Sequence, residues 1–101
     1  MRMLLTVELP HEPFNEAVRK GTAGETIGRI LEEIKPEVVY FTEQDGHRGA
    51  ILVVNVDSPS QVPALAEPFF LNYNADCKFR IAMAPEDLQQ AGLERLGEKW
   101  G

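Results

Sequence analysis

The chain has 101 residues, the size of one domain, and its 44% hydrophobic content lies in the range of globular proteins. Its 10 Lys and Arg residues against 16 Asp and Glu give a net charge of −6 at pH 7. Nucleic-acid binding is therefore not expected, because it requires a surplus of cations facing the phosphates. No apolar stretch is long enough to cross a bilayer, and Glu8 interrupts the apolar start before an export signal could form. We expect one domain over residues 1–101, located in the cytoplasm and without a membrane partner.

The first third of the chain predicts a strand followed by a broken helix. Apolar residues alternate from Met3 to Leu9, which is the period of a half-buried strand, and Pro10 ends it. The following helix contains two apolar faces that lie about half a turn out of phase on either side of residues 21–24. One straight helix cannot bury both faces, so we expect a break at 21–24. There Thr22 and Glu25 have the spacing of a capping box.

The middle of the chain predicts a hairpin and a second helix. Residues 37–43 and 49–56 are rich in β-branched and apolar side chains and flank Asp45-Gly46, a strong tight-turn pair. Ser58 and Gln61 form another capping-box pattern with Pro59 at the first helical position. The helix that follows is expected to bend or end at Pro68.

The last third predicts a fourth strand and a terminal helix. Residues 76–83 alternate again, and Pro85-Glu86-Asp87 is typical of a helix start. The terminal helix is expected over about 86–100, with Leu88, Leu93, Leu96 and Trp100 as its apolar stripe.

The order of these elements predicts an α+β fold of the ferredoxin-like type, β-α-β-β-α-β with a four-stranded antiparallel sheet plus a C-terminal helix. In such a fold the helices cover one face of the sheet and leave the other open. We expect the first and fourth strands to pair with Met3 facing Met83, Leu5 facing Ile81 and Val7 facing Phe79. This register would place Glu8 beside Lys78 and Thr6 beside Arg80 on the open face. Leu4, Ile51 and Val53 would lie among these charges, and a homodimer with its two open faces together would cover them.

The chain resembles the dimeric α/β-barrel proteins, which include muconolactone isomerase, YCII-like proteins and antibiotic-biosynthesis monooxygenases. The similarity lies in Val56-Asp-Ser58 before the second helix, in Leu65-Ala-Glu-Pro-Phe-Phe70 and in Ile81-Ala-Met-Ala-Pro85, and it spans Met3 to about Pro85. Its layout is most similar to muconolactone isomerase and small uncharacterised relatives. The resemblance implies a barrel of eight strands from two subunits, large enough to surround one small ligand. It transfers no catalytic residue to this sequence.

Candidate ligand-binding residues are therefore taken from the expected open face. Glu8 and Arg80, with Thr6 and Lys78, would line a pocket beside apolar walls, where Glu8 could act as a base and Arg80 could bind an anionic group. The alternative interpretation of this group is a cross-strand ion pair that holds an interface together. Tyr40 and Tyr73 are further candidates for binding through their hydroxyl groups, with packing in the core as the alternative.

His11 is a second catalytic candidate, because it follows the first strand at the expected rim of the barrel. His47, beside the hairpin turn, is expected to be solvated. Neither histidine has another His or Cys at a ligand spacing, so no metal site is predicted. Residues 21–28 lack the nucleotide-loop patterns, and no cofactor is predicted. Cys77, the only cysteine, is expected to be a small core residue.

Three hypotheses for the function follow. The first is a small homodimeric α/β-barrel protein that holds a small aromatic or carboxylate-bearing molecule in the barrel. The second is a cofactor-independent isomerase or monooxygenase that uses the same pocket. The third is a structural dimerisation module whose barrel is filled by its own side chains.

Overall fold

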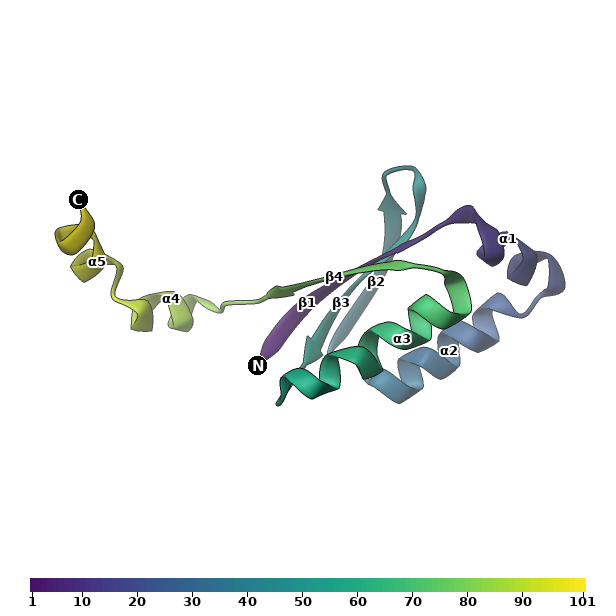
Figure 1. Cartoon of the computed structure of the whole chain (residues 1–101), viewed down its shortest axis with the longest axis horizontal. Helices are drawn as coiled ribbons and strands as arrows, with labels where there is room; N and C mark the ends of the chain where they lie inside the picture. Colours follow the sequence, from purple (N-terminus) through teal and green to yellow (C-terminus); the bar gives the residue numbers. More distant parts are fainter.

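The computed structural model describes residues 1–101 and contains one four-stranded sheet with helices packed on one side (Figure 1). The strand order is β2-β3-β1-β4 and every neighbouring pair is antiparallel. This is the predicted ferredoxin-like arrangement. The elements are β1 (Arg2–Leu9), α1 (His11–Lys20), α2 (Ala23–Ile34), β2 (Val38–Gln44), β3 (His47–Asn55), a 3-10 turn (Pro59–Gln61), α3 (Val62–Tyr73), β4 (Asp76–Ile81), α4 (Pro85–Ala91) and α5 (Leu93–Trp100).

The core lies between the sheet and α2 and α3, and it follows from the alternation in the strands. Leu5 and Val7 of β1 and Leu52 and Val54 of β3 are fully buried on the side that faces the helices. Ile30 of α2 and the α3 residues Leu65, Phe69 and Tyr73 form the helical side of this core. Their neighbours along each strand are thereby placed on the other face, because successive side chains point to opposite sides of a strand.

The predicted helix break is confirmed. α1 ends at Lys20, Gly21 adopts a left-handed conformation with φ 75°, and α2 begins at Ala23. Glycine fits this position because it has no Cβ to clash there. The capping box predicted for Thr22 and Glu25 is wrong, since the Thr22 side chain makes no cap bond and instead donates to the carbonyl of Ala17 at 3.4 Å.

The second helical segment begins as predicted but continues further. The Ser58 hydroxyl accepts the backbone N–H of Ser60, and the Gln61 side chain accepts that of Ser58 at 3.3 Å. α3 then runs through Pro68 to Tyr73. Of the two outcomes expected at Pro68, an end of the helix is wrong. The Pro68 carbonyl accepts the side-chain amide of Asn72 at 2.7 Å.

The register of β1 against β4 differs by two residues from the predicted one. Met3 faces Ile81, Leu5 faces Phe79 and Thr6 faces Lys78. A slip of two residues keeps every side chain on its face, so the hydrophobic pattern is satisfied equally by both registers. The neighbours nevertheless change: Glu8 lies opposite Asp76, and Arg80 lies opposite Leu4.

The C-terminal segment forms two short helices and not the single predicted helix over 86–100. Gly92, with φ 70°, separates α4 from α5. Both helices project away from the sheet (Figure 1), and the molecule measures 59 × 28 × 19 Å. We call residues 82–101 the C-terminal arm. None of the helices is both long and apolar enough to span a membrane.

Two glycines provide a matched test of this packing. A Cβ at Gly49 of β3 would lie 2.9 Å from the Cβ of Gln44 and 3.1 Å from the Val7 carbonyl oxygen, whereas a Cβ at Gly28 of α2 meets nothing within 4 Å. We expect Gly49→Ala to lower the free energy of unfolding by about 1–3 kcal/mol through overpacking. Gly28→Ala should raise it by about 0.5–1 kcal/mol through helix propensity. Urea unfolding monitored by circular dichroism measures both, and equal effects of the two variants would contradict the packing described for β3.

Candidate functional site

The side of the sheet without helices carries a mixed apolar and charged surface, which we call the open face. Its centre is apolar: Leu4 and Val53 are half-buried, and Ile51 is 36% exposed. Ile51 and Val53 of β3 share this face with Leu4 and Thr6, as expected from the sequence. The β2 and β4 residues on this face are Val38, Tyr40, Thr42 and Gln44, and Asp76, Lys78 and Arg80.

A polar hollow of about 150 Å³ lies on the open face at the end near the β2–β3 turn. Thr6 is its most buried lining residue, with 8% of its surface exposed. The Thr6 hydroxyl is buried and has no hydrogen-bond partner. A buried hydroxyl without a partner costs free energy, so the hollow offers an unused donor and acceptor. We call this site the Thr6 hollow; its lining residues are Thr6, Glu8, Gln44, Asp45, Asp76 and Lys78.

The charges of the open face are segregated along the strands. Glu8 and Asp76 face each other at the hollow, and Lys78 is the only cation that lines it. Arg80 lies four residues further along β4, about 13 Å from Asp76 at the usual strand rise. The predicted grouping of Glu8 with Lys78 and Arg80 is therefore corrected: Thr6, Glu8 and Lys78 meet at the hollow, and Arg80 lies toward the other end of the face.

Two histidines meet beside Glu8. The ring centroids of His11 and His47 are 4.7 Å apart, and His47 Nδ1 lies 3.8 Å from Glu8 Oε2. His11 is the first residue of α1 and is exposed, in keeping with a position at the edge of the sheet. His47, expected to be solvated, is half-buried: its side chain is 36% exposed, and its Nδ1 is buried without a hydrogen-bond partner. The sequence missed this contact because it depends on the β1–β3 register.

The two tyrosine candidates lie on opposite sides of the sheet. Tyr40 is on the open face, 70% exposed, and lies beside Ile51. Tyr73 is 2% exposed and belongs to the core, where its ring packs 5.0 Å from that of Phe14. Burial raises the pKa of the Tyr73 hydroxyl, an effect that Thr26 opposes in part. Tyr73 therefore cannot join the other candidates on the open face.

Cys77 occupies the expected place against the core. Burial, and then the neighbouring Asp76 carboxylate, raise the pKa of its thiol to about 11, so the thiol is protonated at neutral pH. It is not a nucleophile in this setting, since the thiolate is the reactive form. No three His, Cys, Asp or Glu side chains are placed together so as to hold a metal ion.

The topology and the uncovered face define a ferredoxin-like α+β protein, and comparison with solved structures agrees. The chain is similar to 5-chloro-2-hydroxyhydroquinone dehydrochlorinase from Burkholderia phenoliruptrix AC1100, solved in complex with 2,5-dihydroxybenzoquinone. The match has a TM-score of 0.60 and 15% sequence identity, and it covers 85% of this chain and 97% of that one. At this identity the similarity shows the fold. No protein-family model and no curated protein sequence matches the chain.

The unpartnered hydroxyl of Thr6 makes a prediction about stability. Thr6→Val removes the hydroxyl while keeping the shape of the side chain, so we expect the free energy of unfolding of the ligand-free protein to rise by about 1 kcal/mol. Thr42→Val, at an exposed position of β2, is the matched control and should change it by less than about 0.5 kcal/mol. Urea unfolding measures both variants. A loss of stability in Thr6→Val would mean that the hydroxyl already has a partner.

Proposed function

We propose that the protein is a homodimer that binds a small organic molecule between two facing open faces, with the Thr6 hollow as the polar end of the site. The observation that carries the proposal is the open face itself, whose apolar centre ends at a buried hydroxyl with no partner. A monomer would leave Leu4, Ile51 and Val53 in water beside this hollow. Surfaces of this kind mark an interface or a ligand site.

A second copy of the chain fits the open face by charge. The acidic end, with Glu8 opposite Asp76, is unfavourable within one sheet, since like charges face each other. A twofold axis across the strands would bring this end against Arg80 of the partner subunit. The same patch then serves both subunits, as a closed twofold interface requires. The apolar residues would meet at the centre, between the two pairs of charges.

The ligand class follows from the mixture of surfaces in the proposed site. Leu4, Ile51, Val53 and the Tyr40 ring offer contacts to a flat apolar group, whereas Thr6, Lys78 and Glu8 offer hydrogen bonds to its polar substituents. The solved neighbour binds 2,5-dihydroxybenzoquinone, a small ring with hydroxyl and carbonyl oxygens, and that compound is therefore the first probe. We propose no cofactor and no metal ion for binding.

The assembly is tested at the centre of the open face. Ile51→Lys places a charge in the proposed interface, and we expect the mass measured by light scattering to fall from that of a dimer to that of a monomer. Val18→Lys makes the same change on α1, away from the sheet, where Val18 is 51% exposed, and it should leave the mass unchanged. A wild-type protein that is monomeric throughout a micromolar dilution series would contradict the proposal.

A second candidate is a cofactor-independent enzyme of the isomerase or monooxygenase type, and the contact of Glu8 with His47 favours it. The contact places a carboxylate 3.8 Å from an imidazole nitrogen, and these are two kinds of group that serve in general acid–base catalysis. His11, whose ring is tilted by 46° to that of His47, is the other nearby acid–base group. Under the third hypothesis, a structural dimer, Glu8 would form only an ion pair.

Proton exchange on ligand binding separates these candidates. Calorimetry with 2,5-dihydroxybenzoquinone in two buffers of different ionisation enthalpy measures the protons taken up or released on binding. If Glu8 and His47 transfer a proton, Glu8→Gln should abolish the exchange while binding remains. Binding without exchange in the wild type supports the simple ligand-binding protein. Absence of binding by both proteins, together with an intact dimer, supports the structural module.

A further inference from the structure

The C-terminal arm extends from the domain and does not pack against it. No residue of α4 or α5 is buried, and both helices lie clear of the sheet and of α1, α2 and α3 (Figure 1). The radius of gyration is 17.1 Å, compared with about 13 Å for a compact chain of this length. The arm thus accounts for the elongated shape.

These helices cannot persist in water by themselves. α4 has 7 residues and α5 has 8, whereas an isolated helix needs about 12–15 residues to be even marginally stable. In α5, Leu93, Leu96 and Trp100 lie on one side of the helix and are 58%, 43% and 76% exposed. Another surface must cover this side, and in this conformation the chain's own domain does not.

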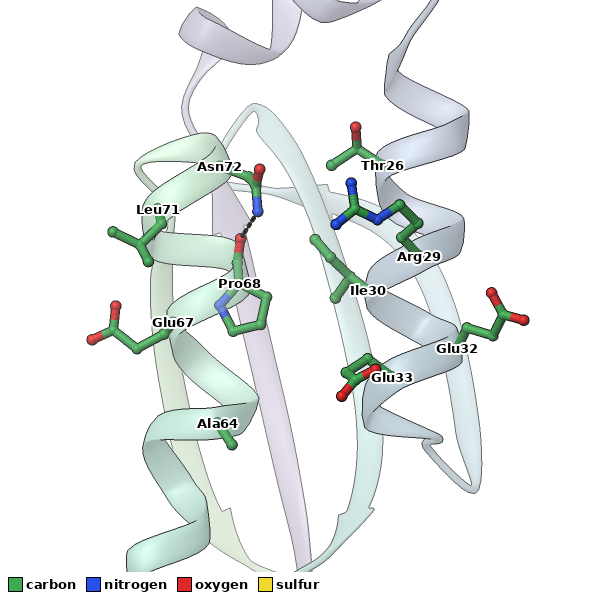
Figure 2. A pocket seen from close by; sticks show the side chains of 10 residues that line it. All are labelled: Thr26, Arg29, Ile30, Glu32, Glu33, Ala64, Glu67, Pro68, Leu71 and Asn72. Carbon is green, nitrogen blue, oxygen red and sulfur yellow. Dashed lines mark hydrogen bonds between the residues drawn. The ribbon is translucent and has the colours of Figure 1, made fainter.

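A groove on the outer side of the helical layer has the composition to receive α5. It lies between α2 and α3 and has a volume of about 810 Å³ (Figure 2). Its apolar parts are Ile30, Ala64, Pro68 and Leu71, and Leu71 is 81% exposed. We call it the α2–α3 groove.

One flank of α5 is complementary in charge to the groove. Glu32, Glu33 and Glu67 line the groove against a single cation, Arg29, and none of these four side chains forms an ion pair within the chain. On α5, Arg95 and Lys99 are four residues apart and therefore lie one above the other on the flank next to Leu96. Glu94 and Glu98 lie on the opposite flank. In the orientation that places the cationic flank against Glu67 on the α3 wall, the acidic flank faces the α2 wall, where Arg29 is the cation.

We propose that α5 of one copy docks into the α2–α3 groove of a second copy, with the arms exchanged reciprocally. A second copy is the occupant because the arm extends away from its own groove and because the complementary charges belong to this same chain. The groove and the open face lie on opposite sides of the domain, so arm exchange and the pairing of open faces are separate contacts. An arm that crosses between subunits would secure the proposed dimer from outside the sheet.

Cross-linking between two differently tagged chains tests the exchange. Both carry Cys77→Ala; one also carries Ala64→Cys or Leu71→Cys in the groove, and the other carries Gly101→Cys at the end of the arm, which keeps Trp100. After mixing, a short bis-maleimide should join the two different chains. Glu25→Cys, on α2 outside the groove, is the matched control and should give at least tenfold less product.

The result that would overturn the proposal is a yield no higher than that of the control. A chain carrying both Leu71→Cys and Gly101→Cys adds a second criterion: a cross-link that forms only within single chains means that the arm folds back on its own groove, which also overturns the exchange.

Charge reversal tests the complementarity. Lys99→Glu should reduce the cross-link yield at least fivefold, and Glu67→Lys in the receiving chain should restore it in part. An unchanged yield in Lys99→Glu would contradict docking in the acidic groove. The arm exchange rests on the proposed dimer, so the cross-link should be lost in the Ile51→Lys background. Lys99→Glu should lose the cross-link while keeping the dimer mass in light scattering, so failure of the arm exchange can be distinguished from failure of the pairing of open faces.

Discussion

The structure depends on the coverage of a four-stranded sheet by helices on one side only. Alternation along β1 and β3 places Leu5, Val7, Leu52 and Val54 under α2 and α3, and burial of these side chains is the main favourable contribution to folding. The same alternation places Leu4, Thr6, Ile51 and Val53 on the other face. The candidate site is thus a direct consequence of how the core is built, because no strand can bury both of its sides under a single layer of helices.

The helical layer shows a second effect of the same constraint. α1 and α2 carry apolar faces that point in different directions, and the left-handed residue Gly21 allows the chain to turn so that both can approach the sheet. Phe14 of α1 then packs on Tyr73 at the end of α3, while Ile30 of α2 fills the centre of the core. This packing also explains why Tyr73 is a core residue and contributes nothing to the open face.

Sequence patterns predicted the elements, their order and the faces of the strands, because these depend on local periodicity. They could not choose between registers that differ by two residues, since both keep Leu5 and Val7 in the core, and the neighbours of Glu8 were wrong for that reason. The contact of His47 with Glu8 is a product of the β1–β3 register and has no local signal. The break at Gly92 did have one, because glycine favours the left-handed conformation that ends a helix, whereas the apolar stripe of residues 88–100 suggested continuity.

A chain of this length buries only a modest fraction of its surface when it folds, so its stability is marginal. Large apolar areas left in water reduce that stability further. Here two such areas remain, the centre of the open face and the apolar side of α5, and they lie on separate parts of the chain. The arm begins at the end of β4, an edge strand that also contributes Lys78 and Arg80 to the open face. A subunit that approaches the open face therefore comes within reach of the arm as well. One second copy of the chain could cover both areas. The ligand site would then be formed by the dimer and would be incomplete in a single chain.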